Sequence, residues 1–148
     1  MDWRVDGSQK VDMKVDMKLK ERMREKIEDG SLTVDDLLDF FTLFIQTAND
    51  SEDARDEVAG YDRAFQFVIR DYRNIWFTVR KQVFEMGMGE LESPDITLEM
   101  DKQLLLSVFS GRKDPTAAYM CGELKVNGNL NDAVKFRTIL EVVQDELE

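Results

Sequence analysis

The sequence predicts an α+β fold, in which helices cover one face of a five-stranded and mostly antiparallel sheet. Two observations lead to this prediction. Between residues 61 and 101, apolar residues recur at every second position, as they do in half-buried strands. On either side of that region they recur at every third or fourth position, as they do in amphipathic helices. Strands that follow one another between groups of helices are typical of a layered α+β domain.

The N-terminal segment fits two structures. Apolar side chains alternate from Val11 to Leu19, as in a strand, but a stripe with a period of four, as in a helix, continues to Ile27. We expect a helix over residues 19–29, ended by Gly30, and both structures stay open for residues 10–18. Residues 1–30 are interpreted as a charged amphipathic extension, distinct from a domain over residues 31–148. A strand in the extension would need a partner, so the hypothesis is that residues 1–30 join two copies into a homodimer.

Helical periodicity begins the domain. Thr33 is placed to cap a helix whose first turn is acidic and whose apolar face starts at Leu37. The polar residues 49–51 end or bend that helix, and Ser51 is placed to cap a short acidic helix that reaches about Val58.

Four strands follow, and their short connections predict an antiparallel meander. Gly87 and Gly89 fall within the alternation of the third strand and no helix follows them, so they indicate a bulge or a close backbone approach and not a phosphate cradle. The apolar faces of the four strands hold Phe65, Phe67 and Ile69; Ile75, Phe77 and Val79; Phe84, Met86 and Met88; and Ile96, Leu98 and Met100.

The C-terminal third returns to helices. Asp101 is placed to cap a helix that ends at Gly111, and Asp114-Pro115 starts another helix that stops at Gly122. Leu124 and Val126 alternate in a short fifth strand. The closing helix runs over residues 130–147, and its apolar positions spread widely around its circumference.

Composition excludes several function classes. The net charge is −11, and residues 31–148 carry all of it, because residues 1–30 hold eight basic and eight acidic groups. Such a body repels phosphates, so no nucleic-acid partner is expected. The longest apolar runs are far shorter than a membrane span, so we expect no stable membrane insertion. A single cysteine, Cys121, forms no internal disulfide, which favours a cytoplasmic location, and we expect its thiol to be buried and structural.

The absence of histidine removes histidine-based nucleophile systems, histidine-ligated metals and the commonest general base. We therefore expect no enzyme activity, no metal and no cofactor. The many Met and Phe residues of the strands and later helices have two interpretations. They form an ordinary core, or they line a cavity for an apolar ligand, since Met adapts to irregular spaces.

Residues 107–140 resemble the sterol carrier protein family of lipid-transfer domains, and the resemblance extends over about residues 33–148. Upstream, Trp76 and residues 94–101 are similar to strand positions of that family. The matching positions are Gly111, Asp114-Pro115, Ala117-Ala118, Gly122, Leu124, Val126, Gly128-Asn129, Ala133 and Lys135.

The resemblance implies a five-stranded sheet with helices on one face and an apolar tunnel between them. It also implies a function, the non-enzymatic binding or transfer of a lipid or fatty-acyl ligand. The alternative is a structural or protein-interaction module that self-associates through the N-terminal extension and holds no lipid. The candidate cavity residues are Phe65, Phe67, Phe77, Phe84, Met86, Leu98, Met100, Phe109, Met120, Leu124, Phe136 and Leu140.

Overall fold

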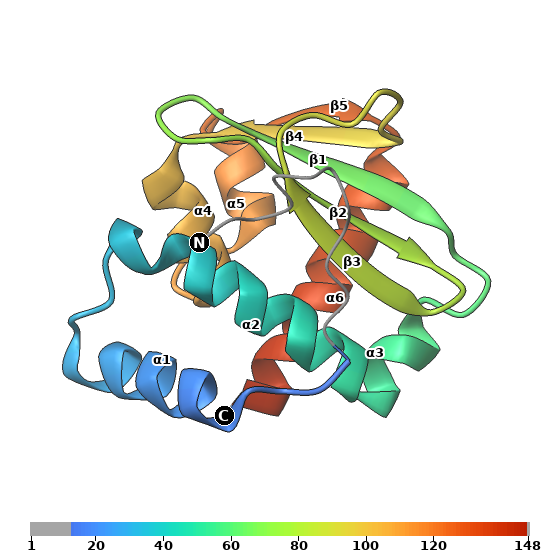
Figure 1. The fold of residues 1–148 in the computed structure, drawn as a ribbon. Coiled ribbons are helices and arrows are strands. Elements are labelled where there is room, and N and C mark those ends of the chain that lie inside the picture. Colours follow the sequence, from blue (N-terminus) through green and yellow to red (C-terminus); the bar gives the residue numbers. More distant parts are fainter. Residues whose placement is uncertain (1–12, 148) are drawn as a thin grey trace.

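A computed structural model of the chain describes residues 13–147 and contains one mixed sheet with helices packed against it (Figure 1). The strands are β1 (Arg63–Ile69), β2 (Ile75–Arg80), β3 (Val83–Met88), β4 (Ile96–Met100) and β5 (Lys125–Gly128). The helices are α1 (Met17–Asp29), the 3₁₀ turn η1 (Val34–Asp36), α2 (Leu37–Asp50), α3 (Glu52–Glu57), α4 (Lys102–Phe109), α5 (Pro115–Met120) and α6 (Leu130–Leu147). The predicted α+β class and the mostly antiparallel five-stranded sheet are confirmed.

The caps follow from the sequence. Ser51 accepts a hydrogen bond from the backbone of Ala54 at the start of α3, and Asp101 accepts one from Leu104 at the start of α4. Gly30 ends α1 with a positive φ of 77°, a conformation that favours glycine.

The predicted four-strand meander is wrong in one respect. The sheet order is β3-β2-β1-β4-β5, so only the first three strands form a meander, and β4 pairs in parallel with β1 on its other side. The reason lies in residues 89–95. β3 ends beside Ile75 of β2, whereas β4 begins beside Phe65 on the far side of β1 and runs in the same direction as β3, so the connection crosses over β2 and β1. Period-two alternation shows which residues share a face but does not show which strands are neighbours.

The buried side chain of Gln66 holds that crossover on the face of the sheet opposite the helices. Its Nε2 donates to the carbonyl of Gly89 at 2.9 Å, and its Oε1 accepts from the backbone of Leu91 at 2.7 Å. Next, the backbone N–H of Asp95 donates to the carbonyl of Ala64, and the Asp95 carboxylate accepts from the backbone N–H of Ala64. These two hydrogen bonds align β4 with β1.

Trp76 lies on the same face and explains one of the strand glycines. A Cβ on Gly87 would lie 2.3 Å from Cζ2 of the Trp76 ring, which is closer than any real contact. The predicted close approach in the third strand is therefore confirmed at Gly87.

The core fills the space between the sheet and the helices (Figure 1). Phenylalanine rings dominate it, with neighbouring ring centroids between 4.6 and 6.4 Å apart. The rings come from α2, the sheet, α4 and α6, so they bind the helical layer to the strands. They belong to Phe41, Phe44, Phe65, Phe67, Phe77, Phe84, Phe109 and Phe136.

The N-terminal helix lies outside α2 (Figure 1). α1 begins at Met17, two residues before the predicted start, because the carboxylate of Asp16 accepts hydrogen bonds from the backbone of Lys18 and Leu19. Residues 13–16 form neither helix nor strand, and residues 10–12 lie outside the described part of the chain. Leu19 and Met23 are buried in the same core as α2. The division into an extension over residues 1–30 and a domain over residues 31–148 stays a prediction.

Candidate functional site

A groove of about 350 Å³ opens between α5, β5 and the first half of α6. Its lining is almost entirely apolar, and Arg137 is the only charged residue among the described residues that form it. The groove is lined by Leu98, Pro115, Thr116, Tyr119, Met120, Leu124, Val126, Leu130, Ala133, Val134, Phe136 and Arg137.

Two short elements and one long helix build this groove. On α6, Leu130, Ala133 and Val134 lie one helical turn apart and form a stripe that ends at Arg137. α5 has only six residues, and only Ala118 of them is buried. Because so little of α5 is packed into the core, its remaining apolar side chains stay at the surface of the groove.

The rim of the groove exposes large apolar side chains. Met120 is 79% exposed, Val134 62% and Leu130 50%, whereas apolar residues of the core are nearly inaccessible. A contiguous exposed apolar patch beside a groove is characteristic of a ligand or partner site.

The twelve predicted cavity residues separate into two groups. Leu98, Met120, Leu124 and Phe136 line the groove. The other eight lie in the buried core behind it and are Phe65, Phe67, Phe77, Phe84, Met86, Met100, Phe109 and Leu140.

Phe136 connects the two groups, because its ring forms part of the groove wall and also lies 5.4 Å from the ring of Phe67. The groove therefore begins where the aromatic core ends.

Eight lining residues were not among the predicted ones, and seven of them come from α5 and α6. The sequence did contain one signal for them. The apolar positions of the last helix spread more widely than a single core face requires, and Leu130, Ala133 and Val134 account for that excess. Apolar periodicity does not identify Thr116, Tyr119 or Arg137, because their side chains carry polar groups.

A polar network fixes the beginning of α6 to the sheet. Asp132, which is only 5% exposed, accepts a hydrogen bond of 2.6 Å from the hydroxyl of Tyr61 and one of 3.3 Å from Nε of Arg63. Burial, together with the hydrogen bond to the Asp132 carboxylate, raises the pKa of Tyr61. Lys135 is held by Glu57 at 2.9 Å on the next turn. These contacts hold the wall of the groove in place.

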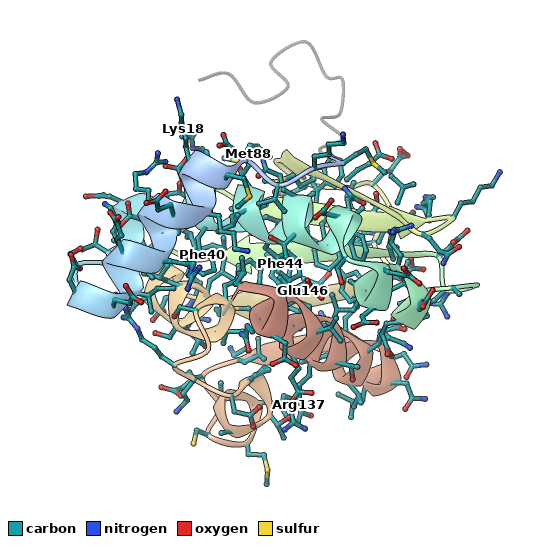
Figure 2. All side chains as sticks on the ribbon, turned by 90° about the horizontal axis from the view of Figure 1, so that it is seen from below. Lys18, Phe40, Phe44, Met88, Arg137 and Glu146 are labelled. Carbon is teal, nitrogen blue, oxygen red and sulfur yellow. The ribbon has the colours of Figure 1, made fainter. Side chains whose placement is uncertain are left out.

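The wall also carries one ion-pair cluster. Nε of Arg137 lies 3.1 Å from Oδ1 of Asp114, and Nη2 lies 3.7 Å from Oε2 of Glu141. In Figure 2, Arg137 lies on the opposite side of the molecule from Lys18 of α1.

The described residues contain no group of three or more His, Cys, Asp or Glu side chains arranged to hold a metal. Over the same part of the chain, no helix is both long and apolar enough to cross a bilayer. The expected burial of Cys121 is wrong. The thiol is exposed, because α5 ends before it and only Ala118 of that helix enters the core.

The sequence model of the SCP-2 sterol transfer family matches residues 41–141. This chain belongs to the SCP-2 sterol transfer family. The family resemblance predicted from the sequence is confirmed, and the matched range contains every strand and the whole groove.

Among curated relatives, the hydroxysteroid dehydrogenase-like protein 2 of Bos taurus is 30% identical over 74 residues. That match covers 49% of this chain and 18% of the cattle protein, so the chain spans less than a fifth of that relative's length. The human protein of the same name gives the same identity and coverage.

Several solved structures have a similar fold. Apo sterol carrier protein 2 from Yarrowia lipolytica superposes with a TM-score of 0.53 at 21% identity, covering 71% of this chain and 89% of that chain. A stereoselective inverting sec-alkylsulfatase from Pseudomonas sp. gives a TM-score of 0.59 at 23% identity, covering 76% of this chain but only 16% of the sulfatase chain. At these identities the likeness concerns the fold alone.

Proposed function

We propose that this chain binds a lipid through one acyl chain in the groove between α5, β5 and α6, and carries it without chemical change. The observation that supports this most is the apolar groove itself, which lies within the part of the chain that matches the sterol transfer family. In this proposal the twelve predicted residues act as the wall and floor of the ligand site, with the eight core residues supporting the four that face it.

The size of the groove suits a single chain. Its volume of about 350 Å³ is near the lower end of the range for small-molecule pockets. Burial of roughly ten methylene groups at about 0.8 kcal/mol each gives about 8 kcal/mol, which corresponds to a Kd of about 1 μM before ordering costs. No bond needs to be made or broken for this function. Within the described part of the chain, the polar side-chain groups of the lining are the hydroxyls of Thr116 and Tyr119 and the guanidinium of Arg137.

A substitution that fills the groove tests this proposal. Ala133 lies in the lining, so Ala133→Trp places an indole where the ligand would lie. Ala117→Trp is the matched control, because Ala117 is exposed on the neighbouring helix α5 but does not line the groove. Binding is measured by titration with pyrene-dodecanol and pyrene-dodecanoic acid. We expect wild type and Ala117→Trp to bind at least one probe, and Ala133→Trp to lose it.

Two results would count against lipid carriage. One is wild-type protein that binds neither probe and yields no lipid on solvent extraction. The other is an Ala133→Trp protein that binds as well as the control. Either result would favour the structural or interaction module.

A further inference from the structure

Among the described residues that line the groove, one side chain is charged, and it already forms ion pairs. Arg137 closes the α6 stripe of the lining and forms ion pairs with Asp114 at 3.1 Å and Glu141 at 3.7 Å. Asp114 is itself fixed as the N-cap of α5, where its Oδ2 accepts a hydrogen bond of 3.3 Å from the backbone of Ala117. Glu141 lies one turn after Arg137 on α6. The guanidinium is therefore held between two carboxylates from two elements.

This arrangement opposes the binding of an anion. A free arginine is the best side chain for a carboxylate or phosphate, because its planar fork donates two parallel hydrogen bonds. Here two carboxylates already pair with the arginine, so the three side chains together have a net charge of −1. The whole chain, which includes them, has a net charge of −11. The carboxylate of a fatty acid would be the third anion around one cation.

An uncharged headgroup meets no such repulsion. Thr116 and Tyr119 line the same groove and carry hydroxyls that donate or accept hydrogen bonds. The guanidinium of Arg137 has five N–H donors, of which the two ion pairs engage only part. A hydroxyl or carbonyl oxygen can accept from such groups without bringing another charge.

From this geometry we infer that Asp114 and Glu141 act as a charge filter, which makes the groove select lipids with an uncharged headgroup over anionic lipids of the same chain length. The inference rests on the proposed lipid-binding function and names the headgroup class for that same site. The side chain of Asp114 is 44% exposed, that of Arg137 46% and that of Glu141 60%. Water and salt therefore screen the repulsion between these carboxylates and an anionic headgroup. We therefore expect a selectivity of about fivefold at low salt, the factor for one charge contact in a water-like dielectric.

The direct experiment compares two probes that differ only in the headgroup. Pyrene-dodecanol and pyrene-dodecanoic acid are titrated into the full chain at mildly alkaline pH, where the acid is ionised. Wild type is expected to bind the alcohol about fivefold more tightly than the acid at low salt, and this ratio shrinks as salt is added.

Removal of the filter should abolish the preference for the alcohol. Asp114→Asn combined with Glu141→Gln frees Arg137 and keeps a good N-cap residue on α5. Acid affinity is expected to rise by about fivefold or more, whereas alcohol affinity stays within about twofold. Adding Arg137→Gln to this double variant should abolish the gain, because the freed guanidinium is what binds the acid.

A control variant separates the local cluster from net charge. Asp39→Asn combined with Glu28→Gln also removes two negative charges, but at a distant position near α1, where Asp39 pairs with Arg22. This control should leave the alcohol-to-acid ratio unchanged.

The charge filter is overturned if wild type binds the acid as tightly as the alcohol, or if the distant control raises acid affinity as much as the groove variant does. Wild type that binds neither probe would instead overturn the proposed lipid-binding function, and the filter with it. The two failures are therefore distinguishable.

Discussion

Replacing Gly87 with alanine tests whether the ring of Trp76 packs directly against this position on the sheet face opposite the helices. The new Cβ would lie 2.3 Å from Cζ2 and 2.7 Å from Cε2 of Trp76. The indole is only 7% exposed, and the strand register places it beside Gln66, which is held by the crossover. The ring therefore cannot move away without disturbing the packing of that face.

The expected cost of Gly87→Ala follows from this overlap. Overpacking of a well-filled site costs about 1–3 kcal/mol, and alanine returns some stability because it restricts the unfolded chain more than glycine does. Gly87 has no positive φ, so backbone strain adds nothing. We expect a net loss of about 2 kcal/mol in the free energy of unfolding, which lowers the Tm by about 4–8 °C for a chain of this length.

The assay is urea unfolding followed by circular dichroism, with Trp76→Leu as a second background. If the indole causes the cost, Gly87→Ala should be nearly neutral in that background, giving a coupling of about 2 kcal/mol between the two positions. Equal costs in the two backgrounds, or no cost in the wild type, would refute the reasoning.

Two further predictions concern Tyr61 and the N-terminus. Because the folded state raises the pKa of Tyr61 above its ordinary value, the unfolded chain releases this proton first as the pH rises, so the free energy of unfolding should fall above about pH 10. Absorbance titration of the native protein should show a late ionisation step that Tyr61→Phe removes; the absence of such a step in the wild type would contradict the hydrogen bond between Tyr61 and Asp132. Dimerisation through residues 1–30 stays a prediction, which light scattering of the chain with and without residues 1–18 checks, with a dimer expected only for the full chain. The same mass for both forms would argue against dimerisation through this segment.

Much of the fold could be predicted from local sequence signals. Caps such as Ser51 and Asp101 satisfy the backbone groups of the turn in which they lie, so their effect is visible in a few residues of sequence. The pairing of β4 with β1 depends instead on the crossover that Gln66 holds, and its hydrogen-bond partners lie 23 and 25 positions away in the chain. No pattern within one strand carries that information.

The candidate site was less predictable than the fold, for a related reason. The alternation of apolar residues identifies side chains that become buried on folding. It does not distinguish a ring that packs on other rings from a ring that faces a groove. Phe84 lies in a strand pattern and Phe136 in a helical pattern, and neither pattern shows that only Phe136 reaches the groove. Arg137 is an ordinary surface residue in the sequence, and its importance follows from the approach of Asp114 across two elements.

If the lipid lies in the groove between α5, β5 and α6, a photoreactive lipid should label the residues that line this groove. A long-chain alcohol with a diazirine on its chain is bound to the full chain, irradiated, and located by peptide mass spectrometry. We expect labelled peptides from residues 115–137, in the segments that hold Met120, Leu124 and Val134. Labels concentrated instead on α1 or α2, with none in residues 115–137, would contradict it.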